Sequence, residues 1–152
     1  MYRLLLDTNI LLDSLLSNRP EHIEALRLLK WCNGSGDYGF AASTSFNDIY
    51  YILRKTYDEP LARKAVNKLM EYVAIAPVAA EECHLSLNSN EPDFEDGLIR
   101  ACAELNDADF IITRDKKAFQ GTKIKSLTAS DFFEQIDHDN KELLAQLFPH
   151  NT

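Results

Sequence analysis

Residues 3–16 read RLLLDTNILLDSLL, and this opening decides the class of fold. Its first four residues have the length and apolar character of a buried strand, which Asp7 ends. From Thr8 onward the apolar residues recur at helical spacing, so a helix follows directly, with Asp7 or Thr8 as its N-cap. A buried strand that runs straight into a helix is typical of α/β proteins.

The alternation of strands and helices continues along the rest of the chain. Short apolar runs predict four more strands, at residues 38–42, 72–78, 109–113 and 123–127. Ser43 or Thr44 is expected to cap the helix after the second strand, and Lys116–Phe119 to form one helical turn. This alternation predicts an α/β protein, a three-layer α/β/α sandwich around a central, mostly parallel twisted sheet.

A chain of 152 residues has the length of one domain, and neither a repeat nor a composition shift divides it. We therefore expect a single domain over residues 1–152, with a helical tail over about residues 129–152. Asp7 and Asp13 interrupt the first apolar run, unlike in a signal peptide, and no run is long enough to span a membrane. The sequence thus predicts a cytoplasmic protein. Its three widely spaced cysteines indicate neither a disulfide framework nor a thiolate metal site.

The charge of the chain is acidic and unevenly distributed. Sixteen Lys and Arg residues stand against 24 Asp and Glu residues, a formal net charge of −8. Such a balance argues against a general nucleic-acid binder, whose affinity comes from cations that neutralise phosphates. Between residues 91 and 115, eight acids stand against two arginines, which gives −6. Clustered acids either form a solvated face or hold a cation.

Four aspartates are predicted to meet at one edge of the sheet. Asp7 follows the first strand, Asp115 lies two residues beyond the DFIIT strand, and Asp48 and Asp96 lie near the starts of helices. Sites in open α/β sheets form beyond the carboxyl ends of the strands. Gathered carboxylates repel one another, and a hard divalent cation such as Mg²⁺ or Mn²⁺ removes that cost and activates water for phosphodiester hydrolysis.

Each of these acids also has a purely structural explanation. Asp7 is well placed as a helix N-cap, and Asp115 as a cap of the turn that follows it. Asp93 and Asp96 have the spacing of a capping arrangement at a helix start, and Asp48 could be a surface residue. Four such caps would then have to meet at one sheet edge by accident.

The chain resembles the PIN domain nucleases over nearly its whole length. The opening LLLDTNILLDSLL is similar to the first motif of that family, an apolar strand leading into Asp-Thr-Asn and a helix. The block DFEDGLIRACAELNDADFIITRDKKAF is similar to its last two motifs. The middle motif departs from the family, which usually has a Glu where STSFNDIYYIL offers Asp48, with Asn47 beside it.

The resemblance implies catalytic metal-binding roles for Asp7, Asp48, Asp96 and Asp115. It implies supporting polar roles for Asn9 and for Thr113 or Arg114. Asp93 and Glu95 flank Asp96, where they either orient water at the site or cap the helix. Because Asp is shorter than Glu, the resemblance leaves open whether one or two metal ions bind.

A basic cluster follows the last motif and is the expected rim for RNA. The rim is placed at Arg114, Lys116, Lys117 and Lys123, with Lys125 in the same cluster. The alternative is a solvated face. Aromatic and basic residues near Tyr51, Arg54 and Lys55 are a second candidate surface for RNA, although their helical spacing favours a core or dimer contact.

The function that the resemblance implies is an Mg²⁺- or Mn²⁺-dependent endoribonuclease. Small members of the family resemble VapC-like toxins, which implies a homodimer, an antitoxin protein as inhibitor and RNA as substrate. The alternative is a PIN-like module that binds RNA or protein and has lost its activity, which the unusual Asp48 keeps open. The four isolated histidines and the lack of a GxSxG turn or a Gly-rich phosphate loop favour no other hydrolase.

Overall fold

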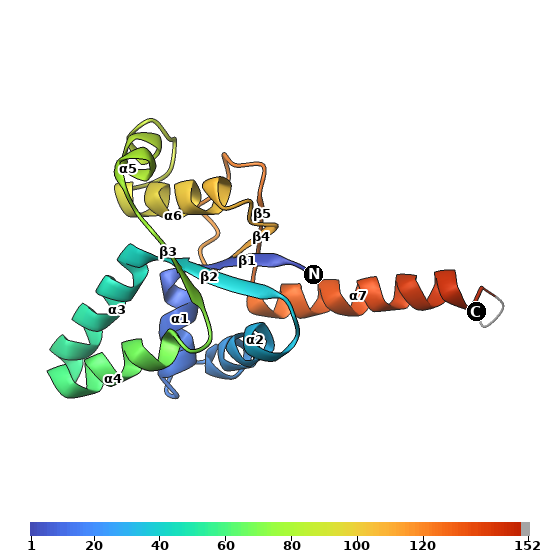
Figure 1. The fold of residues 1–152 in the computed structure, drawn as a ribbon, viewed down its shortest axis with the longest axis horizontal. Helices are drawn as coiled ribbons and strands as arrows, with labels where there is room; N and C mark the ends of the chain where they lie inside the picture. The colour runs from blue at the N-terminus through green and yellow to red at the C-terminus, as the bar shows by residue number, and fades with distance from the viewer. Residues whose placement is uncertain (150–152) are drawn as a thin grey trace.

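The computed structural model describes residues 1–149, which form a five-stranded parallel sheet with helices on both faces (Figure 1). The strands are β1 (Arg3–Leu6), β2 (Tyr38–Ala42), β3 (Ala74–Ala76), β4 (Phe110–Ile112) and β5 (Lys125–Leu127). The helices are α1 (Thr8–Leu15), α2 (His22–Gly34), α3 (Ser43–Thr56), α4 (Glu59–Leu69), α5 (Ala80–Leu87), α6 (Phe94–Leu105) and α7 (Ala129–Leu147). The last three residues of the predicted tail lie outside the described residues.

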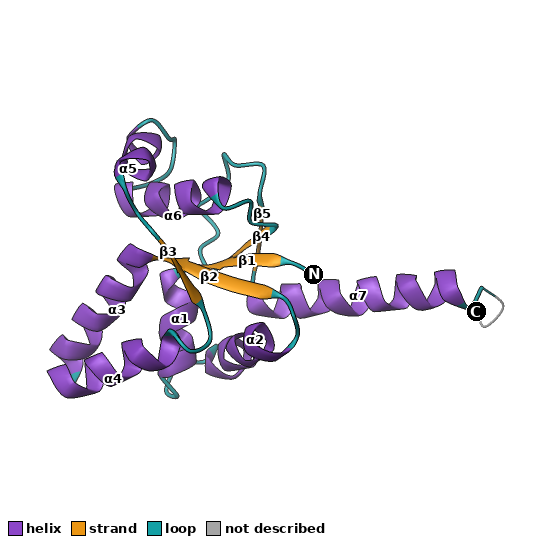
Figure 2. Ribbon diagram, in the orientation of Figure 1, coloured by secondary structure: helices purple, strands orange, loops and turns teal. Residues whose placement is uncertain are grey.

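The predicted three-layer α/β/α sandwich is confirmed. Helices α5 and α6 cover one face of the sheet, and α1 to α4 lie on the other (Figure 2). Helix α7 begins under β5 and extends away from the rest of the fold (Figure 1). All four strand pairs are parallel, so the sheet is more regular than predicted. None of the helices in residues 1–149 has both the length and the apolar character needed to cross a bilayer.

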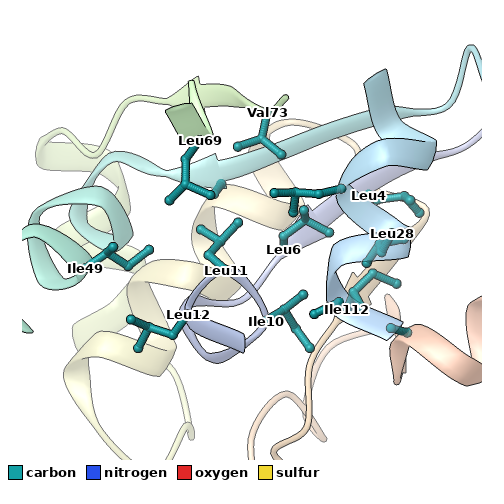
Figure 3. Close-up of a cluster of buried hydrophobic side chains, with 14 of the residues drawn as sticks. Leu4, Leu6, Ile10, Leu11, Leu12, Leu28, Ile49, Leu69, Val73 and Ile112 are labelled. Atoms are coloured by element: carbon teal, nitrogen blue, oxygen red, sulfur yellow. The ribbon is translucent and has the colours of Figure 1, made fainter. Parts of the chain in front are cut away.

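Strand β1 supplies side chains to both halves of the core because successive residues of a strand point to opposite faces. Leu4 and Leu6 belong to the cluster with α1 to α4 and α7, and Leu5 belongs to the cluster with α6. Figure 3 shows Leu4 and Leu6 between the side chains of the surrounding helices. All three leucines are fully buried, and each such side chain contributes about 1.5–3 kcal/mol. Strand β1 ends at Leu6, the last of these three buried leucines.

Two local predictions are wrong. Helix α3 has Ala42 as its N-cap residue, with no side-chain cap, because the Ser43 hydroxyl instead accepts a hydrogen bond from the Val78 backbone N–H at 3.1 Å. The predicted helical turn at Lys116–Phe119 is a non-helical loop in which Phe119 has a φ of 64°. A left-handed residue at this point is incompatible with a right-handed helical turn.

The strand order β3-β2-β1-β4-β5 determines where a site can form. The chain leaves β1 in one direction toward β2 and returns on its other side as β4, so a crevice opens beyond the carboxyl ends of β1 and β4. Backbone bonds continue past these ends: the Asp7 N–H donates to Ile112 at 2.9 Å and the Thr113 N–H donates to Leu127 at 2.9 Å. Asp7 and Thr113 are therefore held side by side at the crevice.

Candidate active site

Asp7 is the most constrained carboxylate of the site. It is 5% exposed and accepts three hydrogen bonds: from the Thr8 N–H at 2.8 Å, the Thr113 hydroxyl at 2.8 Å and the Asn9 amide at 3.2 Å. A carboxylate has about four acceptor positions, so one remains open. Asp7 caps α1 and also faces the crevice, so its structural and chemical roles do not compete.

Thr113 joins Asp7 to Asp115. Its hydroxyl donates to Asp7 and accepts from the Asp115 N–H at 3.0 Å. One oxygen of Asp115 caps the following turn by accepting the N–H groups of Lys117 and Ala118, at 2.8 and 3.3 Å. The second oxygen of Asp115 is left for the site.

Helix α3 contributes Asp48, and its partner is Glu95 from α6. The two carboxyl groups lie within hydrogen-bonding reach, and this contact with Asp48 raises the pKa of Glu95 to about 7. The sequence predicts only a flanking role for Glu95, because no local pattern shows that α6 faces α3.

Asp96 lies one residue further along α6. No N–H or hydroxyl group within residues 1–149 donates to its carboxylate, whereas Asp93 caps the helix by accepting the Asp96 N–H at 2.8 Å. Burial, followed by the charges of Asp93 and Asp7, raises the pKa of Asp96 to about 6. Of the two acids with capping spacing, Asp93 is therefore the cap and Asp96 has a free carboxylate.

The five acids Asp7, Asp48, Glu95, Asp96 and Asp115, here called the edge acids, share one electrostatic environment. The charge of Asp7 acts on both Glu95 and Asp96, and Asp115 raises the pKa of Asp7 and of Asp96. The largest cause for Asp7 is burial, which also raises its pKa. Neighbouring carboxylates thus destabilise the charged forms of Asp7, Glu95 and Asp96.

The residues fit a hard divalent cation. All the side chains that meet here offer oxygen, and the Thr44 hydroxyl, one helical turn before Asp48, is the buried side-chain polar atom that lacks a partner in residues 1–149. No three of the edge acids lie within 4.8 Å of one another. An open arrangement of this kind suits Mg²⁺ or Mn²⁺, which use few carboxylates and keep several waters.

A second acidic group lies on α7, outside the crevice. Within residues 1–149, His138, Asp139 and Glu142 are the residues whose potential ligand atoms lie within 4.8 Å of one another. They belong to a helix surface where such ion pairs are common: His138 and Glu142 are exposed, and their N···O distance is 3.7 Å.

The predicted basic rim is divided by the structure. Arg114 donates two hydrogen bonds to the fully buried Asp13, at 2.6 and 3.1 Å, and Arg19 donates a third at 3.2 Å. The guanidinium of Arg114 therefore ties the end of β4 to α1. Lys116, Lys117 and Lys123 are exposed and form no ion pair within residues 1–149.

A sequence profile described as the PIN domain matches residues 3–117. The chain therefore belongs to the PIN domain family. The search of curated proteins with this sequence finds no significant match.

Solved structures of similar fold include proteins of toxin–antitoxin systems. VapBC-1 from nontypeable Haemophilus influenzae has a TM-score of 0.63 at 20% identity, over 84% of this chain and 98% of that chain. A toxin–antitoxin complex from Klebsiella pneumoniae has a TM-score of 0.61 at 23% identity, over 82% and 96%. The sarcin-ricin loop cleaving toxin VapC20 of Mycobacterium tuberculosis has a TM-score of 0.61 at 14% identity, over 74% and 89%. At these identities the likeness establishes the shared fold.

Proposed function

We propose that the protein is an endoribonuclease that uses Mg²⁺ or Mn²⁺ held by Asp7, Asp48, Asp96 and Asp115. The observation that carries the proposal is that Asp7 and Asp115, beyond the carboxyl ends of β1 and β4, lie close enough to Asp96 for their charges to raise its pKa. Glu95 joins them as a fifth acid through its contact with Asp48. PIN domains are a nuclease family, and membership of the chain in it supports the same reaction class.

A divalent cation, when bound, neutralises the scissile phosphate and lowers the pKa of the attacking water. The residues of the chain position and orient the reactants. Thr113 and Asn9 fix the rotamer of Asp7, and Thr113 also fixes the backbone that carries Asp115. Glu95, in contact with Asp48, places a further carboxyl group beside the reactants.

We further propose that the protein is the toxin of a toxin–antitoxin pair, with a protein antitoxin as its partner and a homodimer as its assembly. The similar structures support the toxin and its antitoxin partner, because they include a toxin–antitoxin complex and VapC20, which is described as a toxin that cleaves the sarcin-ricin loop. The homodimer rests on the family resemblance alone.

An inactive binding module is the second candidate, and Asp48 is the observation that favours it. The short acid at this position reaches less far than the usual Glu of the family. Glu95, which contacts Asp48 from the facing helix, supplies the longer side chain, so we favour the active enzyme.

The test is cleavage of a mixed pool of structured and single-stranded RNA. EDTA should abolish cleavage, Mg²⁺ or Mn²⁺ should restore it, and Ca²⁺ should support little turnover because its coordination is looser. Asp7→Asn should be inactive under the same conditions. Cleavage that persists in EDTA, or that Asp7→Asn retains at the wild-type rate, would contradict the proposal.

A further inference from the structure

A groove continues from the edge acids toward the open edge of the sheet. It encloses a cavity of about 420 Å³, and its lining includes Thr113 and Asp115 on one side and Lys125 and Thr128 on the other. This volume falls within the range of about 300–1,000 Å³ that is typical of ligand sites. Because Asp115 belongs to both, the groove and the crevice form one continuous surface.

Two lysines border this groove. Lys116 lies on the loop after β4 and Lys125 on the edge strand β5, and both line the cavity. Neither forms an ion pair within residues 1–149. Asp115 and Asp131 also line the groove, but they accept backbone N–H groups, from Lys117 at 2.8 Å and from Thr128 at 3.4 Å, and neither pairs with the two lysines. Within residues 1–149 the ammonium groups of Lys116 and Lys125 are therefore not paired with a carboxylate and can contact an anionic ligand.

The wall that carries Lys116 is held in place by buried charges. The carboxylate of Glu91, 2% exposed, accepts the Phe119 N–H at 2.7 Å and pairs with Arg100 at 3.3 Å. Arg100 also donates to the Gly121 carbonyl at 3.2 Å, and Phe119, 3% exposed, anchors the loop in the core. These contacts hold Phe119 at its φ of 64°, so the groove exists before any ligand arrives.

We propose that this groove binds a phosphate group of the RNA strand next to the cleaved bond, with Lys116 and Lys125 as its cationic contacts. The inference rests on the proposed RNA-cleaving function and gives the strand a path from the edge acids across β5. Of the rim predicted from sequence, it keeps Lys116 and adds Lys125, and it assigns Arg114 to its bridge with Asp13. The patch of Tyr51, Arg54 and Lys55 is the rival, but no edge acid lines its cavity.

The experiment measures binding of a labelled single-stranded RNA by fluorescence anisotropy in EDTA, across a series from about 50 to 200 mM salt. Lys125→Ala should lower the slope of log affinity against log salt by about 0.7, so that its loss of affinity across the series is about 2.6-fold smaller than that of the wild type. Lys125→Arg should restore the slope. Lys64→Ala, which removes an exposed lysine of α4, is the matched control and should leave the slope unchanged.

The possible results distinguish the phosphate groove from the proposed nuclease activity. If Lys125→Ala keeps the wild-type slope and affinity, or if Arg54→Ala lowers the slope instead, the groove is not the phosphate site, and metal-dependent cleavage then tests the nuclease proposal on its own. If the slope depends on Lys125 but no divalent ion supports cleavage, the groove stands and the nuclease proposal fails. A nucleoside monophosphate that competes as well as the RNA would show a site for free phosphate esters instead of a strand. A wild-type protein that binds no RNA at low salt would overturn the groove.

Discussion

Replacement of Asp96 by Asn removes one negative charge from the edge acids and leaves the helix cap at Asp93 in place. The pKa of Asp96, raised from 3.8 to about 6, corresponds to at most about 3 kcal/mol of repulsion and lost solvation at alkaline pH. Solvent at the rim of the crevice screens this to about 1 kcal/mol. The charge also interacts favourably with the N-terminus of α6, by about 0.5 kcal/mol, so the free energy of unfolding without metal should be unchanged or slightly raised.

The wild type and Asp96→Asn should differ far more in how strongly a bound metal ion stabilises them. At a Mn²⁺ concentration about a hundred times the Kd, binding stabilises the wild-type protein by about 2.7 kcal/mol. For a domain of this size the Tm then rises by about 5–10 °C. Asp96→Asn should lose most of that rise. Glu81→Gln, which removes an exposed acid from the first turn of α5, should keep it.

The assay is a thermal melt followed by circular dichroism, with EDTA or with Mn²⁺. A variant Asp96→Asn that melts several degrees below the wild type in EDTA, yet gains as much from Mn²⁺, would refute the reasoning. Asp96 would then be a structural cap and not a metal ligand.

Three further predictions concern charged and hydrogen-bonded side chains of the fold. Asp13→Asn should lower the free energy of unfolding by about 2 kcal/mol, because Arg114 and Arg19 lose their buried partner while staying partly solvated. Chemical denaturation measures this loss. A loss no larger than that of Glu59→Gln, which breaks an exposed ion pair, would contradict the prediction. The metal-free protein should lose stability as the pH rises from about 4 to 7. The raised pKa values of Glu95 and Asp96 make the folded state hold protons that the unfolded state has released. Denaturation in EDTA at several pH values tests this, and a free energy of unfolding that rises through that window would contradict it. Thr113→Val should reduce RNA cleavage in single-turnover assays, because Asp7 loses one of its three hydrogen-bond donors. The control Thr56→Val, at the far end of α3, should cleave at the wild-type rate. Equal rates for the two variants would show that Thr113 has no role in the site.

The parts of the fold that sequence predicted are those that a short stretch of chain determines. RLLLD is an apolar run that ends in Asp7, and the DFIIT run is followed two residues later by Asp115, so each strand and the acid beyond its carboxyl end are readable together. This pattern predicts Asp7 and Asp115 at the crevice. The parallel direction of β1 to β4 is expected from the helices between them, whereas no helix lies between β4 and β5.

The parts that sequence did not predict depend on contacts between distant segments. Glu95 meets Asp48 because α6 faces α3 across the crevice, and no local pattern encodes that distance. Asp13 and Arg114 are 101 residues apart, so the sequence places Arg114 with the nearby lysines in the rim, whereas in the structure it pairs with the buried Asp13. The loop after Asp115 was predicted as a helical turn because the buried contacts that hold Phe119 come from Glu91, in another segment.

The most direct test of the proposed site is the position of Mn²⁺ in crystals of the protein, located by its anomalous scattering. We expect a peak between Asp7, Asp96 and Asp115, at the end of β1 and β4, that disappears in Asp7→Asn crystals. A peak only at His138, Asp139 and Glu142 on α7, or no peak at millimolar Mn²⁺, would contradict the metal site at the sheet edge.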